Sequence, residues 1–210
     1  MDQTKAVLYI STGCAHCGGL MNLLSERLKQ GAIARLEMIN LSSSPESAAE
    51  HDIKSVPFLL LNDFQFEGGM SADELDYWID QSHSEQGMSA YFAHLIGKGR
   101  RMDVEARLRS DPAHFKTLAE LLAAPDSGMD LRLGVAATFE ELSSEPYVEQ
   151  AITALGPLSE STDARLRADV CHLLSLMDHA DAHRWLNARL DDEDAEVREI
   201  VREAMEDRAR

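Results

Sequence analysis

Apolar residues follow two different patterns along the chain. In residues 1–83, short runs rich in β-branched and aromatic residues alternate with stretches in which apolar residues recur every three or four positions. The short runs predict strands and the longer stretches predict helices. The predicted strands are residues 6–10, 35–41, 56–62 and 64–67, and the predicted helices are residues 17–30, 45–51 and 71–80. This order, β-α-β-α-β-β-α, predicts an α/β fold with a mixed sheet and helices on its faces.

The second pattern begins near residue 84, after which only helical spacing is found. Breaks between the apolar stretches fall at clusters of Gly, Pro and Asp. The predicted helices are residues 87–96, 102–109, 112–123, 130–142, 147–155, 164–176, 180–190 and 195–208. We therefore expect two domains, an α/β domain over residues 1–83 and an all-α domain over residues 84–210.

A short motif recurs in the predicted helical domain. Arg132, Arg167 and Arg198 each follow a Leu or Val near the start of a predicted helix, at spacings of 35 and 31 residues. The last two copies share Asp-Ala-x-[Leu/Val]-Arg, at residues 163–167 and 194–198. The Asp is placed to cap the helix N-terminus, and we expect the Arg to lie across the next repeat and pair with its acidic residues.

This motif is similar to that of the HEAT-repeat family, in which the Asp and the Val-Arg pair recur in the same way. The resemblance implies helix pairs that stack into a solenoid, because one pair cannot bury its own apolar face. An ordinary helical bundle is the alternative interpretation of residues 84–210.

The composition is that of a globular protein without a membrane span. Of the 210 residues, 44% are hydrophobic, which is enough for ordinary cores. No apolar run approaches the roughly 20 residues that cross a bilayer. The N-terminal segment lacks the basic region and the apolar stretch of a signal peptide. We therefore expect a cytoplasmic protein that contacts no membrane.

Both predicted domains are acidic. The chain carries 20 Lys and Arg against 37 Asp and Glu, a formal net charge of −17 at pH 7. Residues 1–83 hold 5 against 12, and residues 84–210 hold 15 against 25. Such a surface repels nucleic-acid phosphates and anionic lipid, so we expect neither as a partner. A basic protein partner is compatible with this charge.

Two of the three cysteines, Cys14 and Cys17, are separated by two residues between a predicted strand and a predicted helix. A helix N-terminus carries free N–H groups and a partial positive charge, and both stabilise a thiolate. One helical turn brings the two sulfurs within disulfide reach. We therefore expect Cys14 to be the exposed, attacking sulfur and Cys17 to be the resolving one. The third cysteine, Cys171, lies among apolar residues and is expected to be a buried, inert thiol.

His16 lies between the two cysteines. An imidazole there can donate a hydrogen bond or add positive charge to the thiolate, which stabilises the dithiol and makes the disulfide more oxidising. The alternative is that His16 points into solvent. A metal site at Cys14, His16 and Cys17 is also open, but it needs ligands that the sequence does not supply as a second cysteine pair.

Asp178, His179 and His183 form another candidate metal cluster. Histidines at positions i and i+4 share a helix face and can chelate Zn²⁺ or Ni²⁺. No third strong ligand is evident in the sequence. An ordinary polar helix face is therefore the favoured interpretation, and we predict no bound metal.

Three motifs follow one another in the first domain, and their order carries a family resemblance. They are Cys14-Ala-His-Cys17, then Ser55-Val56-Pro57 at the start of a predicted strand, then Gly68-Gly69. Together they resemble the thioredoxin-like fold over about residues 5–80, and especially its glutaredoxin-like and small archaeal-type members. The Pro of this motif is cis in that family, and the resemblance implies that Val56 and Pro57 form a ledge for an extended substrate.

The same resemblance implies a place for a small thiol. Gly68 and Gly69 match a double glycine that lies near the glutathione tail in glutaredoxins. Ser71 and Asp73 are placed to contact the charged end of such a ligand. Glutathione is therefore a candidate reductant, and no other cofactor is expected.

These features predict a thiol–disulfide oxidoreductase that acts through Cys14 and Cys17, with His16 tuning the dithiol. The HEAT-like domain would recruit a protein substrate or partner. The alternative is a protein of another class, a non-enzymatic scaffold or redox-sensing interaction protein in which the helical domain is the working part.

Overall fold

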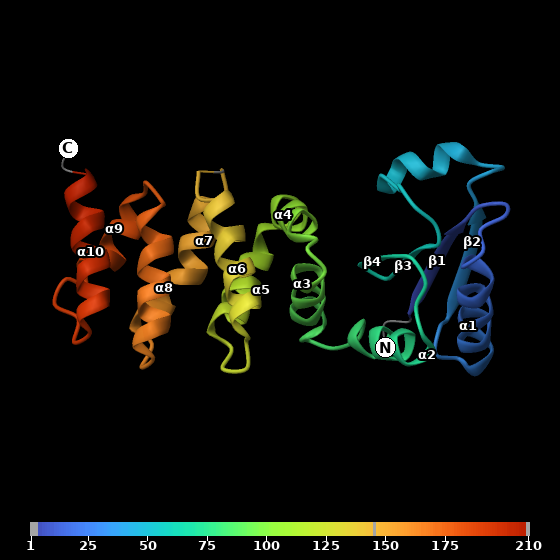
Figure 1. The fold of residues 1–210 in the computed structure, drawn as a ribbon, viewed down its shortest axis with the longest axis horizontal. Coiled ribbons are helices and arrows are strands. Elements are labelled where there is room, and N and C mark those ends of the chain that lie inside the picture. Colours follow the sequence, from blue (N-terminus) through green and yellow to red (C-terminus); the bar gives the residue numbers. More distant parts are fainter. Residues whose placement is uncertain (1–3, 145, 209–210) are drawn as a thin grey trace. The chain divides into compact units, whose positions relative to one another are not determined.

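A computed structural model describes residues 4–144 and 146–208 and divides the chain into two compact units (Figure 1). The first unit is Met1–Ala90 and the second is Tyr91–Arg210. The division falls inside one helix, α3 (Gly87–Gly97). The first unit contains a small mixed sheet and the second is helical, so the expected combination of an α/β part with an all-α part is confirmed.

The sheet of the first unit has four strands in the order β2-β1-β3-β4. Its strands are β1 (Lys5–Ile10), β2 (Arg35–Asn40), β3 (Phe58–Leu61) and β4 (Phe64–Glu67). β1 pairs with β2 in parallel and with β3 in antiparallel, and β3 pairs with β4 in antiparallel. β1 and β3 are therefore the two central strands, and apolar side chains of both are fully buried.

Three helical segments accompany this sheet: α1 (Cys17–Gln30), the 3₁₀ helix η1 (Pro45–His51) and α2 (Ala72–Gln81). α1 ends at Gly31, whose φ of +81° is the left-handed conformation that glycine adopts without strain. Arg27 of α1 donates two hydrogen bonds to the Asp76 carboxylate of α2, at 2.5 and 2.8 Å. This pair joins the two helices and holds the pKa of Asp76 below its ordinary value.

One strand begins later than its apolar run predicts. The run covers residues 56–62, whereas β3 begins at Phe58. Pro57 lacks an N–H group to donate to a neighbouring strand. Val56 and Pro57 therefore lie in the loop ahead of β3, and the peptide bond between them is cis, as the family resemblance implies.

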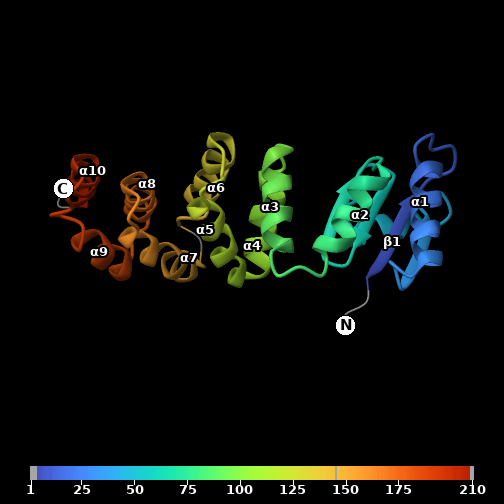
Figure 2. The same ribbon diagram turned by 90° about the horizontal axis from the view of Figure 1, so that it is seen from below.

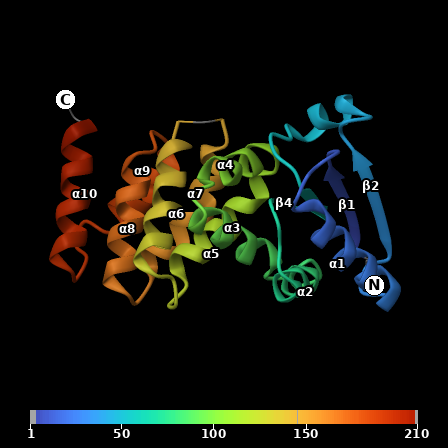
Figure 3. The same cartoon turned by 45° about the vertical axis from the view of Figure 1, so that its right-hand side comes forward.

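The second unit is built of helices in two layers. After α3 they are α4 (Arg101–Ser110), η2 (Pro112–His114), α5 (Phe115–Ala123), α6 (Met129–Glu141), α7 (Val148–Leu155), η3 (Gly156–Glu160), α8 (Ala164–Ser175), α9 (Ala180–Asn187) and α10 (Ala195–Arg208). Figure 2 shows α6, α8 and α10 in one row with α5, α7 and α9 in the other, and Figure 3 shows α6, α8 and α10 side by side. Within the second of these rows, η3 packs closely against α9 at Gly156, where any Cβ would meet the indole of Trp185.

Arginines of the recurring motif join successive helices of this unit. Arg132 of α6 pairs with Asp169 of α8. Arg167 of α8 donates to both carboxylate oxygens of Asp192, at 2.8 and 3.0 Å. These side chains of Arg167 and Asp192 are only 4% and 2% exposed. The bidentate contact lowers the pKa of Asp192, and Arg132 and Arg167 each pair with an acidic residue near the next copy of the sequence motif, as predicted.

The remaining residues of the motif, Asp163, Asp194 and Arg198, make hydrogen bonds to residues close to them in sequence. Asp163 caps α8 by accepting a hydrogen bond from the Arg165 N–H at 3.0 Å, and Asp194 caps α10 through the Glu196 N–H at 2.9 Å. The predicted capping role is therefore confirmed. Arg198 differs, since its guanidinium donates to the backbone carbonyl of Asp192 and not to a following repeat.

No helix within residues 4–144 and 146–208 is both long and apolar enough to cross a membrane.

Replacing Arg167 with Met is expected to destabilise the helical unit by about 3 kcal/mol, because the buried Asp192 carboxylate loses its bidentate partner and keeps only the more distant Arg189, at 3.8 Å. Urea unfolding followed by circular dichroism measures the change. The matched control is Arg184→Met, which removes an exposed contact with Asp181 of 3.1 Å and should cost at most about 1 kcal/mol.

The difference between wild type and Arg167→Met should also depend on pH. Because Arg167 lowers the pKa of Asp192, the pair contributes fully above the ordinary pKa of an Asp carboxyl. That contribution is lost as the pH falls through the lowered pKa, so the two proteins should converge in acid. A difference that stays constant or grows on acidification would contradict the assigned role of the pair.

Candidate dithiol site and helical groove

The candidate site lies where two loops meet at one edge of the sheet. β1 ends at Ile10 and β3 begins at Phe58, and the antiparallel register places Tyr9 opposite Phe58. The loop that leaves β1 and the loop that enters β3 therefore emerge at the same edge. This topology brings Cys14 of the first loop beside Val56 of the second.

Cys14 of the first loop and Cys17 at the start of α1 form a disulfide. The Sγ–Sγ distance is 2.01 Å and the Cα–Cα distance is 5.5 Å. Cys17 is the first residue of α1 and is buried, whereas Cys14 is half-buried in the turn ahead of the helix. Cys14 therefore precedes the first residue of the helix by three positions, and its N–H donates to the Ser11 carbonyl oxygen at 3.2 Å. The first cysteine is therefore partly exposed and the second is covered.

The second loop presents a backbone carbonyl to the sulfur of Cys14. Cys14 Sγ lies 3.9 Å from the carbonyl oxygen of Val56. In the disulfide this sulfur has no proton to donate, so the contact is one of proximity. Val56 and Pro57 thus lie directly beside Cys14, as the family resemblance implies.

Strand β4 fixes the position of this loop. Ser55 Oγ donates to a Glu67 carboxylate oxygen at 3.0 Å, and the Gly68 N–H donates to the Pro57 carbonyl at 2.8 Å. Gly68 has a φ of +86°, a conformation that favours glycine, and Gly69 follows it at an exposed position. Glu67 was not singled out from the sequence, although it ends a predicted strand immediately ahead of the double glycine.

Strand β2 supports the dithiol loop from the other side. The Thr12 N–H donates to Ser42 Oγ at 3.0 Å, and Asn40 donates to Thr12 Oγ1 at 3.3 Å. The Asn40 side chain also accepts from the Ser42 N–H at 3.0 Å. Sequence reasoning missed Asn40 and Ser42, but the signal was there, since parallel strands end at the same edge and bring the segments after them together.

His16 occupies the N-cap position of α1. Its side chain is exposed and makes no capping hydrogen bond. In the disulfide form, therefore, His16 faces solvent, and any interaction with sulfur belongs to the reduced form, in which Cys14 carries a thiol or thiolate.

The N-terminus of α2 is closed by its own side chains. Ser71 Oγ accepts from the Glu74 N–H at 3.2 Å, and the Glu74 carboxylate accepts from both the N–H and the hydroxyl of Ser71 at 2.9 Å. This reciprocal arrangement is a capping box. Ser71 is thus engaged by Glu74, and Asp73 beside it is exposed.

The other cysteine and histidine clusters have structural surroundings. His179 caps α9, with Nδ1 accepting from the Asp181 N–H at 3.2 Å, so it precedes the helix that carries His183. Among the residues that the structure describes, no three His, Cys, Asp or Glu side chains gather as a metal site. Cys171 is fully buried, and burial raises the pKa of its thiol to about 11, as expected of an inert thiol.

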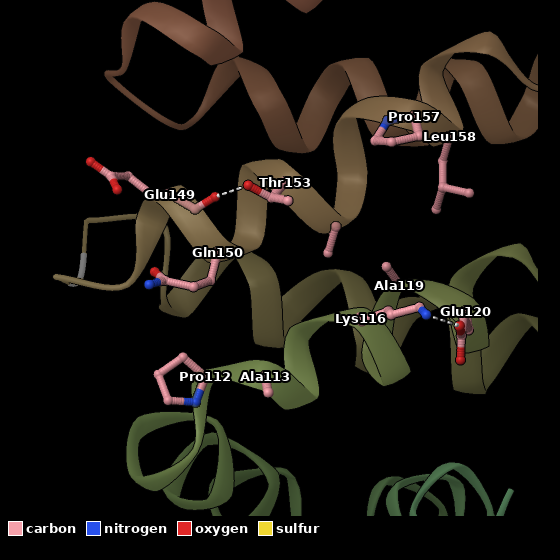
Figure 4. A pocket seen from close by; sticks show the side chains of 11 residues that line it. Pro112, Ala113, Lys116, Ala119, Glu120, Glu149, Gln150, Thr153, Pro157 and Leu158 are labelled. Atoms are coloured by element: carbon pink, nitrogen blue, oxygen red, sulfur yellow. Dashed lines mark hydrogen bonds and ion pairs between the residues drawn. The ribbon is translucent and has the colours of Figure 1, made fainter. Parts of the chain in front are cut away.

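A groove of about 530 Å³ lies between α5 and α7 in the helical unit (Figure 4). Its apolar lining consists of Pro112, Ala113, Ala119, Ala154, Pro157 and Leu158. Glu149 of α7 and Glu120 of α5 lie on opposite sides of it, and Lys116 is 3.9 Å from Glu120. Glu149 in turn lies 3.7 Å from His179 Nε2. The groove therefore combines an apolar lining with two carboxylates, each of which has a basic side chain nearby.

The structure brings Cys14, Cys17, Val56 and Pro57 together at one sheet edge and joins Gly68 to them through Pro57. No protein-family model matches this chain, and no curated protein matches it.

Replacing His16 with Ala is expected to lower the reduction potential of the dithiol by about 20 mV, since an exposed polar partner contributes about 1 kcal/mol and 30 mV corresponds to about 1.4 kcal/mol. The physical reason is loss of a group that stabilises the reduced, thiolate form. Equilibration with dithiothreitol, followed by thiol alkylation and mass spectrometry, measures the potential. His172→Ala, an exposed change on α8, is the control, and identical potentials for wild type and His16→Ala would reject this role.

Proposed function

We propose that the protein is a thiol–disulfide oxidoreductase of thioredoxin-like type, in which Cys14 and Cys17 carry the reaction. The observation that carries the proposal is the pairing of a half-buried Cys14 with a buried Cys17, next to the Val56 carbonyl. An accessible sulfur and a covered partner three residues later are what two-step disulfide exchange requires.

The reaction exchanges two electrons between the Cys14/Cys17 pair and a substrate disulfide, and it needs no other oxidant or reductant. The Cys14 thiolate attacks one sulfur of a substrate disulfide, forming a mixed disulfide and releasing the first substrate thiolate. The Cys17 thiolate then attacks Cys14 Sγ, which releases the second substrate thiolate and forms the Cys14–Cys17 disulfide. Two electrons pass from the protein dithiol to the substrate, and the reverse sequence oxidises a substrate dithiol.

The loop before β3 positions the substrate. The Val56 carbonyl beside Cys14 is a hydrogen-bond acceptor for the N–H of an extended substrate segment, as in strand addition. Pro57 supplies no competing N–H. The contacts from Ser55 and Gly68 keep this ledge in place during the exchange.

A second candidate function, protein binding by the helical unit, is favoured by the groove between α5 and α7. We propose as its occupant a protein segment with apolar side chains and a Lys or Arg. The small residues on the groove floor leave room for such side chains, and Glu120 and Glu149 complement the positive charge. The unit would then be a HEAT-like recruiting module.

Cys17→Ser is expected to accumulate a mixed disulfide between Cys14 and a synthetic peptide that contains a disulfide, because the second step has no attacking thiolate. Cys14→Ser should form no such adduct. Intact-mass measurement detects the adduct, and reduction of the same peptide by wild type with dithiothreitol as donor measures turnover. Cys171→Ala is the control, because that thiol is buried away from solvent. Absence of both the adduct and turnover would leave protein binding as the function.

Ala154→Arg is expected to weaken binding of a synthetic peptide of Leu and Lys by about tenfold, because the added side chain fills the groove and repels the Lys residues. Fluorescence anisotropy measures the affinity. A peptide of Ser and Lys with the same charge is the control for nonspecific attraction to an acidic protein. Equal binding of the two peptides, or equal affinity of wild type and variant, would remove the groove as a docking site.

A further inference from the structure

We propose that the dithiol site acts on disulfides in positively charged protein segments and disfavours glutathione. This inference rests on the proposed exchange reaction. It adds the charge class of the substrate, and it assigns Glu67 as a specificity-determining residue.

Four of the five Lys and Arg side chains of the first unit lie away from the site. Residues 1–90 contain five Lys and Arg. Lys5 and Arg35 begin the parallel strands β1 and β2, at the sheet edge opposite the dithiol loop. Arg27 and Lys29 occupy the last turn of α1, about 15 Å along the helix from Cys17 at about 1.5 Å per residue.

The fifth cation, Lys54, lies near the site but already faces an anion. Its Nζ is 3.0 Å from the Asp52 carboxylate, and both side chains are exposed. The loop that enters β3 therefore offers no net positive charge ahead of Ser55. An anionic thiol compound finds little here to hold its carboxylates.

The N-terminus of α2, where a ligand carboxylate could bind, is occupied by the side chain of Glu74. A free helix N-terminus attracts anions through its N–H groups. At α2, which follows Gly68 and Gly69, the Glu74 carboxylate accepts the Ser71 N–H and hydroxyl at 2.9 Å. A second carboxylate would have to displace Glu74 and would meet its negative charge. Glutathione carries more carboxylates than ammonium groups, and its binding at the N-terminus of α2 is therefore disfavoured.

Glu67 places negative charge next to the substrate ledge. Its carboxylate accepts from Ser55 Oγ at 3.0 Å, two residues before Pro57, and its backbone is paired with Phe58. An extended segment that pairs with the Val56 carbonyl must pass close to this side chain. A Lys or Arg near the substrate cysteine gains a favourable interaction there, and a Glu or Asp is repelled.

The test compares three peptides that share one disulfide and differ only in flanking residues, Arg, Ser or Glu, together with oxidised glutathione. Reduced protein is mixed with each, and the rate is divided by that of dithiothreitol with the same compound, which removes the intrinsic reactivity of the disulfide. The Arg-flanked peptide should react about tenfold faster than the Glu-flanked one and faster than glutathione, with a ratio that falls as salt is added.

Glu67→Gln should narrow the Arg-to-Glu ratio about threefold, because the amide keeps an acceptor for Ser55 but loses the charge. Glu85→Gln removes the same charge near the opposite edge of the sheet, where His83 contacts Thr4 at 2.5 Å, and should leave the ratio unchanged. Equal effects of the two variants would overturn the assignment to Glu67.

The remaining outcomes separate this inference from the proposed function. If wild type reacts with every compound at equal normalised rates, or fastest with glutathione, the charge preference is wrong and the exchange function stands. If wild type reacts with none of them, including the neutral Ser-flanked peptide, the exchange function itself is wrong.

Discussion

The antiparallel pairing of β1 with β3 is the constraint on which the candidate site depends. The register sets Tyr9 opposite Phe58, so the chain leaves β1 and enters β3 at the same edge. A slip of one residue would reverse which side chains face the core, and the buried Leu8 and Leu59 resist it. Cys14 and Val56, which are 42 residues apart in sequence, meet because of this register.

The outer strands then fix the two loops that the central strands bring together. β2 ends beside β1 and contributes Asn40 and Ser42 to the dithiol loop, and β4 ends beside β3 and contributes Glu67 and Gly68 to the opposing loop. Each loop is therefore held by polar contacts from a neighbouring strand end. In the proposed exchange reaction the S–S bond is absent from the reduced protein, and these contacts would then keep the two loops in place.

The spacing of apolar residues along the sequence predicted the helices and strands well. The features that it did not predict depend on contacts between elements that are far apart in sequence. The strand and helix order, the Asp caps and the pairing of Arg167 with an acidic residue of the next repeat all follow from residues close in sequence. The Ser55–Glu67 contact and the groove between α5 and α7 depend on how separate elements pack, which periodicity does not encode. The roles of Cys14 and His16 in exchange rest on chemistry that only a reduced protein can display.

The N-termini of the two main helices of the first unit differ in their capping and in their nearby charges. α2 carries Asp73 and Glu74 in its first turn and closes its free N–H groups with a capping box. α1 has no acidic residue in its first turn, no side-chain cap from His16, and Arg27 and Lys29 in its last turn. Since a helix N-terminus stabilises negative charge, a carboxylate at the start of α1 would compete with a thiolate there. The N-terminus of α1 is thus left without a carboxylate beside the Cys14–Cys17 disulfide, whereas the N-terminus of α2 is occupied by Glu74 of the same helix, and this difference is consistent with the proposed preference of the site.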